Sequence, residues 1–304
     1  TAALSRMLGN WFQSHLGVVT GIVMAASGVG GSALSLVLSG IMESAGWRTS
    51  LLFAAGLLAA VAVMIFFVMK DRPEELGLQP YHDPERRGAA HKPKKVAAPW
   101  AGVPMQVLLK KPYFYLTMIG MMLATIASNG VYSAVVPHLQ DRGLSAAYAA
   151  KMLSLMLVLL AVDKIVLGML ADRFGAHFST LLCVLFTFSG IVVLTLVKNE
   201  WQAVIAVVLL SVSVCLNGFI QPLLAAEIFG RSAYNTTLGI MMAMLSVGGL
   251  LSSPLVNFSF DATGSYTRIL IVLAVIAAVD ALFLLPAFHA EAKYRRELEA
   301  SGQL

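Results

Sequence analysis

The stretch "AVDKIVLGMLADRFG", residues 161–175, places an aspartate and a lysine side by side inside an apolar run. From Met152 to Leu170, Asp163 and Lys164 are the only charged residues. A helix of that length nearly crosses the roughly 30 Å of hydrocarbon in a bilayer. An ionisable side chain at that depth costs several kcal/mol and marks a functional site by default. The stretch therefore predicts a membrane-spanning helix that carries a site.

The composition extends this interpretation to the whole chain. Of 304 residues, 58% are hydrophobic and 12% are charged, against roughly 25% charged in an ordinary soluble domain. Eight apolar runs are long enough to cross a bilayer as helices: 16–42, 50–69, 113–138, 148–171, 178–197, 201–228, 237–260 and 269–288. These runs predict an all-α, polytopic membrane protein. The net charge of +5 does not indicate nucleic-acid binding, because the basic residues gather between the runs.

Lysine and arginine are distributed unevenly between the two predicted sides of the membrane. If the connection after run 50–69 is cytoplasmic, fifteen lie on the cytoplasmic side and five on the other. This bias fits the positive-inside rule and predicts a cytoplasmic carboxyl terminus. We expect a cell membrane of the bacterial inner-membrane type.

An internal repeat explains how the predicted helices are grouped. Residues 21–49 align without a gap to residues 239–267, with ten of 29 positions identical. Repeated halves are typical of transporters, and the symmetry predicts four further spans before the first copy. We therefore expect part of a twelve-span protein. Its expected units are the end of an amino-terminal helical bundle (1–70), a charged, proline-rich cytoplasmic linker (71–111), a six-helix carboxy-terminal bundle (112–290) and a cytoplasmic tail (291–304).

Four segments carry a family resemblance. "GMLADRFG" (168–175) is similar to the loop motif G-x-L-A-D-R-x-G of the major facilitator superfamily. "DRPEELGLQP" (71–80), "AAEIFGRSAY" (225–234) and "FDATGSYT" (260–267) resemble its monocarboxylate and oxalate–formate branch. The resemblance implies the superfamily fold, with two helices of the amino-terminal bundle followed by the six-helix bundle. It also implies a gating role for the loop residues Gly168, Asp172, Arg173 and Gly175.

Lys164 is the first candidate for substrate binding. It precedes Asp172 by eight residues, which places it about 12 Å inside the membrane boundary. The resemblance puts it where this branch carries an arginine that receives the substrate carboxylate. A cation in a low-dielectric cavity offers an organic anion both charge neutralisation and hydrogen bonds. The alternative is that Lys164 pairs with an acidic residue of the other half.

Two further groups are candidates for proton coupling. Asp163 lies about 100° around the helix from Lys164, so the two side chains do not face each other. Asp163 could carry a coupling proton, or it could hold its helix in place through a neighbouring hydroxyl. His138 is expected at the outer mouth, either as a proton relay or as an ordinary interfacial histidine.

Polar stripes supply the other substrate-binding candidates. Asn129 and Tyr132 share a face of run 113–138, and Asn217 and Gln221 recur every four residues just before Pro222, a predicted bend. The resemblance implies that these helices line a central cavity. Hydrogen bonding between helices is the alternative role, because it alone keeps asparagine and glutamine in a membrane.

These observations together favour a secondary active carrier of small organic anions, driven by proton symport or anion exchange. Oxalate–formate exchangers carry a second lysine in the helix corresponding to 237–260; this run has none, which favours a monocarboxylate. A permease for an uncharged solute or a drug exporter is the alternative. We expect neither an enzyme nor a cofactor or metal, because the sequence holds no HExxH, CxxC or phosphate-loop motif.

Overall fold

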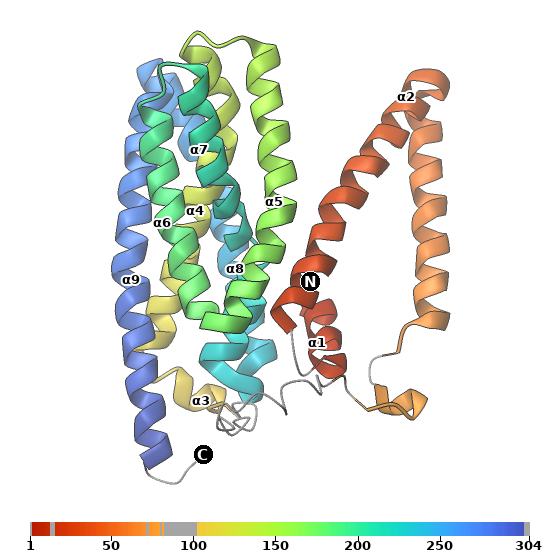
Figure 1. Ribbon diagram of the computed structural model, residues 1–304, viewed down its shortest axis with the longest axis vertical. Coiled ribbons are helices and arrows are strands. Elements are labelled where there is room, and N and C mark those ends of the chain that lie inside the picture. Colours follow the sequence, from red (N-terminus) through yellow and green to blue (C-terminus); the bar gives the residue numbers. More distant parts are fainter. Residues whose placement is uncertain (1, 13–15, 71–72, 80, 82–101, 301–304) are drawn as a thin grey trace.

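The chain is almost entirely helical (Figure 1). A computed structural model describes residues 2–12, 16–70, 73–79, 81 and 102–300; most of the expected linker and residues 301–304 of the expected tail lie outside these ranges. The described elements are α1 (Ala2–Trp11), α2 (Leu16–Val68), η1 (Pro73–Leu76), α3 (Met105–Leu108), α4 (Pro112–Asp141), α5 (Ala146–Phe174), α6 (Ala176–Thr195), α7 (Glu200–Ser213), η3 (Val214–Leu216), α8 (Ile220–Thr263) and α9 (Tyr266–Ala300).

Six helices in the described part are long and apolar enough to cross a membrane, and a seventh crossing results if the bent pair Glu200–Leu216 and Ile220–Gly230 forms one span. They correspond to the predicted runs from 50–69 onward. The run 16–42 forms the first arm of α2, several of whose side chains fall outside the described residues. A bilayer favours helices because it offers backbone groups no water to bind. The predicted all-α membrane fold is confirmed.

α2 is a hairpin whose two arms meet at Gly46. The φ of this residue is 81°, in the left-handed region that glycine adopts without steric cost. Figure 1 shows the first arm leaning toward the other helices and the second arm standing farther out. The second arm exposes large apolar side chains, with Leu52 at 74% and Phe66 at 78%. Such a surface suits hydrocarbon or further helices better than water.

The helices from α4 to α9 form one bundle, in which α4 packs against both α8 and α9. Small residues allow the closest approaches between helices. At Gly248 of α8, a Cβ atom would lie 2.9 Å from the carbonyl oxygen of Met122 on α4. The internal repeat aligns Gly248 with Gly30 of α2. The two aligned glycines differ in their surroundings, because a Cβ atom at Gly30 would meet nothing within 4 Å.

The span that begins at Glu200 is broken within the bundle. After α7, the chain tightens into η3 and then leaves the helix at Asn217 and Gly218, where the φ of Gly218 is 89°. The two helical segments differ in direction by 49°. The prediction of a bend at Pro222 is wrong by four residues. Pro222 lies in the first turn of α8, where a missing N–H group costs no helical hydrogen bond.

One end of the bundle holds the start of α4, the turn between α5 and α6, and the last turns of α9, and we call it the linker end. Here Tyr113 of α4 lies beside Tyr294 of α9, with ring centroids 6.2 Å apart. α9 continues to Ala300, ten residues past the expected end of the bundle at residue 290. The residues expected to form a tail are therefore helical as far as Ala300.

Candidate functional site

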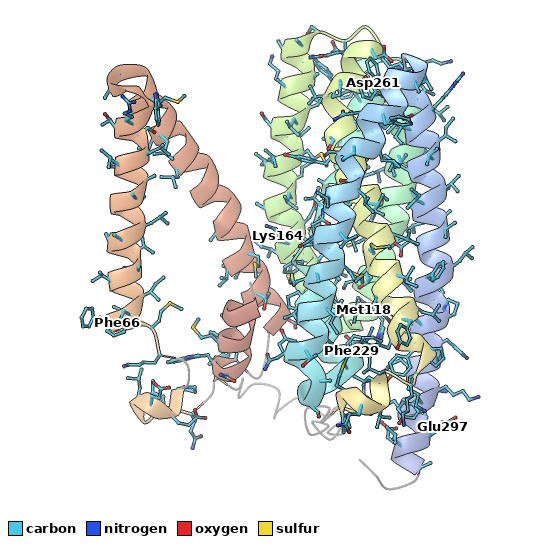
Figure 2. All side chains as sticks on the ribbon, turned by 180° about the vertical axis from the view of Figure 1, so that it is seen from behind. Phe66, Met118, Lys164, Phe229, Asp261 and Glu297 are labelled. Atoms are coloured by element: carbon cyan, nitrogen blue, oxygen red, sulfur yellow. The ribbon has the colours of Figure 1, made fainter. Side chains whose placement is uncertain are left out.

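Lys164 lies where α5 contacts the first arm of α2 (Figure 2). Its half-buried ammonium group donates a hydrogen bond to the carbonyl oxygen of Met24, at 3.1 Å. No described carboxylate lies within salt-bridge distance of this ammonium group. A carbonyl dipole satisfies one N–H donor but leaves the positive charge without a counterion. Within the described residues, Lys164 is therefore a cation held between two helices by a neutral partner.

Gly21 sets the distance between those two helices. A Cβ atom at this position would lie 2.5 Å from the carbonyl oxygen of Lys164 and 3.1 Å from the Cα atom of Ile165. Any side chain would push α2 away from α5. Because Met24 follows Gly21 by three residues on the same helix, the close approach also brings its carbonyl oxygen within reach of Lys164.

Asp172, in the predicted gating loop, makes a second contact between the same helices. Its Oδ2 atom accepts a hydrogen bond from the backbone N–H of Val18, at 3.0 Å. Val18 lies in the first turn of α2, where backbone N–H groups have no partner in the helix and a negative charge is favourable. Of the other predicted loop residues, Gly168 is buried in α5, and exposed Arg173 stacks on Phe174 at 5.2 Å.

Gly175 ends this loop and contacts a glutamate from a distant part of the chain. Its φ is 92°, and a Cβ atom there would lie 2.8 Å from Oε1 of Glu227. Glu227 accepts a hydrogen bond from the N–H of Ala176 and lies 2.6 Å from Nδ1 of His177. Nε2 of His177 lies 3.7 Å from buried Glu291.

The sequence alone does not indicate this cluster, because Glu227 and Arg231 are four residues apart and helical spacing favours a local pair. The side chain of Arg231 falls outside the described residues. The available signal was His177, an ionisable residue that follows the loop motif GMLADRFG by two positions.

Asp163 points away from Lys164, as the helical spacing predicts. Ser211 on α7 is its nearest polar neighbour, and its Oδ2 atom is buried without a hydrogen-bond partner in the described structure. The Ser211 hydroxyl donates to the carbonyl oxygen of Val208, at 2.9 Å.

A polar network joins α4 to the break at Asn217 and Gly218. The side-chain amide of Asn217 donates to Oδ1 of Asn129 at 2.8 Å and to the hydroxyl of Ser128 at 3.1 Å. Ser128 in turn donates to the carbonyl oxygen of Ser213, at 2.9 Å. Asn217 and Asn129 are each half-buried, so the structure brings these two predicted residues together at a partly accessible position.

The remaining candidates lie apart from that network. Tyr132 is 36% exposed on α4, whereas Gln221 is fully buried and its amide atoms have no partner among the described residues. His138 was expected at an outer mouth, but it is fully buried, with Nε2 3.0 Å from the carbonyl oxygen of Leu194 on α6. α4 thus turns this side chain toward α6, and the proton-relay role of His138 stays a prediction.

Comparisons with known proteins give a consistent pattern. The family model of the Major Facilitator Superfamily matches residues 1–228. Monocarboxylate transporter 12 of Rattus norvegicus is 26% identical over 288 residues, covering 86% of this chain and 57% of the relative. Monocarboxylate transporter 13 of the same species is 25% identical, covering 92% and 62%. The MFS transporter asaE of Aspergillus flavus is 23% identical, covering 91% and 59%. The chain thus spans about three fifths of the length of these relatives.

A solved structure shows the same fold. The MFS transporter FucP in its outward conformation matches with a TM-score of 0.50 and 14% sequence identity, covering 94% of this chain and 86% of FucP. At this level of identity the match concerns the arrangement of helices alone.

Proposed function

Because the chain belongs to the major facilitator superfamily, we propose that it transports small organic anions of the monocarboxylate type, by alternating access coupled to proton symport or to anion exchange. It is a multi-pass membrane protein, and its named relatives are transporters and not enzymes. Since it spans only part of their length, the transport activity is proposed for the whole protein that contains it.

The proposed organisation places the substrate between two bundles. Residues 1–70 belong to one bundle, 71–111 form the linker, 112–290 form the other bundle, and 291–304 end the chain. The excess of lysine and arginine at the linker end supports a cytoplasmic location for this end and for the carboxyl terminus. The contact between α2 and α5 then lies on the boundary between the two bundles.

The observation that carries the proposal is the state of Lys164. Its positive charge lies between α2 and α5, where the ammonium group donates a hydrogen bond to the carbonyl oxygen of Met24. An unpaired charge in a membrane is costly, and a carboxylate on the substrate removes that cost while it is bound. Asn129, Asn217 and Tyr132 are only partly covered and supply neutral hydrogen-bonding groups. Gln221 and His138 are fully buried in this conformation and contribute no surface to the proposed site.

Asp163 is proposed as the coupling group. Ser211 has one hydroxyl proton but two neighbouring acceptors, the carbonyl oxygen of Val208 and the carboxylate of Asp163. When Asp163 is protonated, it can donate to Ser211 while Ser211 donates to Val208. The arrangement therefore offers a bound proton a hydrogen-bonded position in the membrane. In an anion exchanger, Asp163 has only the positioning role and its proton is not transported.

The gating role is proposed for the contacts of α2 with α5. Asp172 binds the first turn of α2, and Lys164 binds the next turn but one. Both contacts close the linker end between the bundles. Binding of a carboxylate to Lys164 competes with Met24 for the ammonium group, which couples occupancy of the site to the contact between the helices.

A charge-removing variant tests the assignment. In the complete protein, reconstituted into proteoliposomes, Lys164→Gln keeps an N–H donor for Met24 but loses the charge. We expect uptake of labelled lactate to fall to background, and Lys164→Arg to retain part of it. Lys151→Gln is the matched control, because Lys151 is an exposed lysine on the same helix. Full uptake by Lys164→Gln would remove the site assignment.

Competition separates the two candidate cargoes. Short-chain carboxylates should inhibit uptake, whereas sugars and other uncharged solutes should not. Inhibition by an uncharged solute at the same site, with no effect of carboxylates, would favour the permease alternative.

A further inference from the structure

One face of α9 is an apolar stripe directed away from the rest of the molecule. Ile271, Val275, Leu282 and Leu285 are all between 51% and 69% exposed. Their spacing of three, four or seven residues keeps them on one side of the helix. Figure 1 shows α9 at the opposite side of the bundle from α2. In a membrane protein, such a stripe faces the acyl chains of the lipids.

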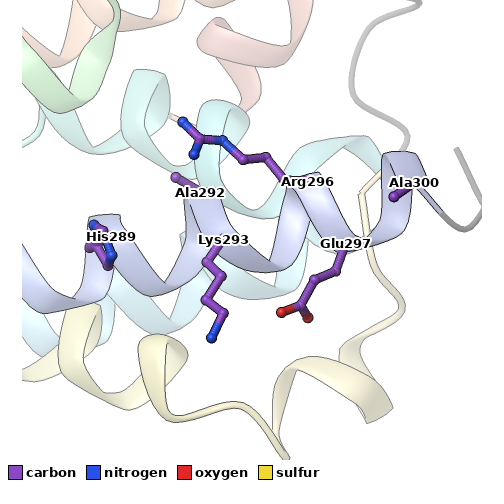
Figure 3. A pocket seen from close by; sticks show the side chains of 6 residues that line it. All are labelled: His289, Ala292, Lys293, Arg296, Glu297 and Ala300. Carbon is purple, nitrogen blue, oxygen red and sulfur yellow. The ribbon is translucent and has the colours of Figure 1, made fainter.

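The same stripe becomes basic toward the linker end. His289, Lys293 and Arg296 follow Leu285 at intervals of four, four and three residues, so they continue its face of α9. They line one shallow groove with Ala292, Glu297 and Ala300. Figure 3 shows Arg296 reaching to one side of the helix and Lys293 with Glu297 to the other. The groove thus contains two permanently charged basic side chains, one histidine and one carboxylate.

Contacts with other helices locate the groove relative to the membrane surface. Glu291 lies beside His177, in the first turn after the loop between α5 and α6. The ammonium group of Lys111, the last residue before α4, lies 3.7 Å from the ring centroid of Tyr294. Both contacts place residues 291–294 of α9 at the level where the apolar spans end. Tyrosine at this level is typical of the interface.

The distances then match the headgroup layer. Lys293 and Arg296 lie about 3 Å and 7.5 Å beyond Glu291 along the helix. The polar layer of one leaflet is about 5–7 Å thick. The lysine and arginine side chains therefore reach the depth at which lipid phosphates lie, directly below the stripe that contacts the acyl chains.

We propose that His289, Lys293 and Arg296 form a binding site for the headgroup of an anionic phospholipid. The phosphate accepts charge-assisted hydrogen bonds from the lysine and the arginine, and the acyl chains, which extend through about 15 Å in one leaflet, lie along Leu285 and Leu282. Neither Lys293 nor Arg296 has a carboxylate partner among the described residues, whereas the adjacent Arg295 pairs with Glu299 at 3.7 Å. The continuity with the apolar stripe favours a lipid over a soluble phosphate. The proposal does not depend on which solute is transported.

Photo-crosslinking of lipids to the complete protein tests the proposal. The protein is reconstituted into phosphatidylcholine vesicles that contain a photoreactive phosphatidylglycerol, and crosslinked peptides are mapped by mass spectrometry. Each basic residue near a membrane surface contributes about 1 kcal/mol of attraction to anionic lipid. We expect crosslinking to residues 285–300 to fall about 30-fold in the variant Lys293→Gln/Arg296→Gln, which corresponds to those two contributions.

The control removes two charges at the other end of the protein. Lys198→Gln/Arg268→Gln changes two residues at the end of the bundle opposite to the linker end and should leave the crosslinking unchanged. Equal labelling by a photoreactive phosphatidylcholine, or equal losses in both double variants, would overturn the proposal. So would complete displacement by soluble glycerol phosphate, which would indicate a site for a free phosphate.

A measurement on the unchanged protein covers the case in which the variant fails to fold. Raising the salt concentration from about 0.1 M to 1 M shortens the Debye length from about 10 Å to 3 Å. Phosphatidylglycerol crosslinking to α9 should decrease under these conditions. If it does not change, the headgroup is not held by charge and the proposal is wrong.

Discussion

Replacing Gly21 by alanine tests whether the contact between α2 and α5 controls transport. The new Cβ atom would lie 2.5 Å from the carbonyl oxygen of Lys164, whereas ordinary contact begins at 3.4 Å. The neighbour is backbone and cannot rotate away. The two helices must therefore separate by about 0.9 Å at this point.

The separation has a calculable effect on the site. The hydrogen bond from Lys164 to Met24 is 3.1 Å long, and adding the same displacement takes it to about 4 Å, beyond hydrogen-bonding distance. Overpacking of this kind costs about 1–3 kcal/mol. If only the conformation with the linker end closed bears this cost, its population relative to the open one falls about 5- to 150-fold.

The population change can be measured with spin labels. Ile22 on α2 and Val162 on α5 are 53% and 52% exposed, and the two native cysteines are buried. Double electron–electron resonance on the complete protein should show a longer label-to-label distance in Gly21→Ala. Gly40→Ala is the control, because a Cβ atom at Gly40, on the same arm of α2, meets nothing within 4 Å. Identical distance distributions and identical uptake in the two variants would refute the reasoning.

Two further variants address single contacts. Asp172→Asn keeps an acceptor for the N–H of Val18 but loses the charge at the start of α2. We expect the free-energy difference between the two states to change by about 0.3–1 kcal/mol in favour of the open state, seen as more of the longer label-to-label distance, and Asp172→Ala to change it further. A distance distribution identical to that of the wild type would show that this contact does not hold the gate closed. Asn217→Leu removes the donor to Asn129 and Ser128 and should lower the free energy of unfolding in detergent by about 1–3 kcal/mol. Ser154→Ala is the control and should have little effect, because the hydroxyl group of exposed Ser154 donates to Ala150 of its own helix. An unchanged unfolding temperature in Asn217→Leu would contradict the network.

The fold could be predicted from the sequence because bilayer thickness sets the length of apolar runs. The runs 113–138, 148–171 and 178–197 are helices within three residues of the predicted bounds, whereas run 201–228 is broken at Asn217 and Gly218 and the last helix continues to Ala300. The glycine repeat was informative in part, since Gly21 and Gly248 lie where two backbones approach closely, whereas their aligned partners Gly239 and Gly30 meet nothing within 4 Å. Glycine is retained at such positions for steric reasons that sequence spacing can show.

The candidate site was less predictable, because its contacts join residues far apart in the chain. Glu227 contacts His177, fifty residues earlier in the chain. His138, expected at the outer mouth, is directed at α6, where its Nε2 atom lies 3.0 Å from the carbonyl oxygen of Leu194. Helical periodicity shows which residues share a face, but it does not show which helix packs against that face. The separation of Asp163 from Lys164 was predictable, because it depends on local geometry alone. The roles proposed for these residues remain predictions.

The hydrogen bonds between α2 and α5 lie near one end of the first arm of α2. Val18 and Met24 make these bonds, and the turn at Gly46 lies 22 residues beyond Met24, or about 33 Å along the axis. A tilt of about 10° around the hydrogen-bonded end therefore carries the turn through roughly 6 Å. In the proposed gating mechanism, a displacement of about 1 Å at the ammonium group of Lys164 would therefore accompany a displacement of several ångströms at the turn.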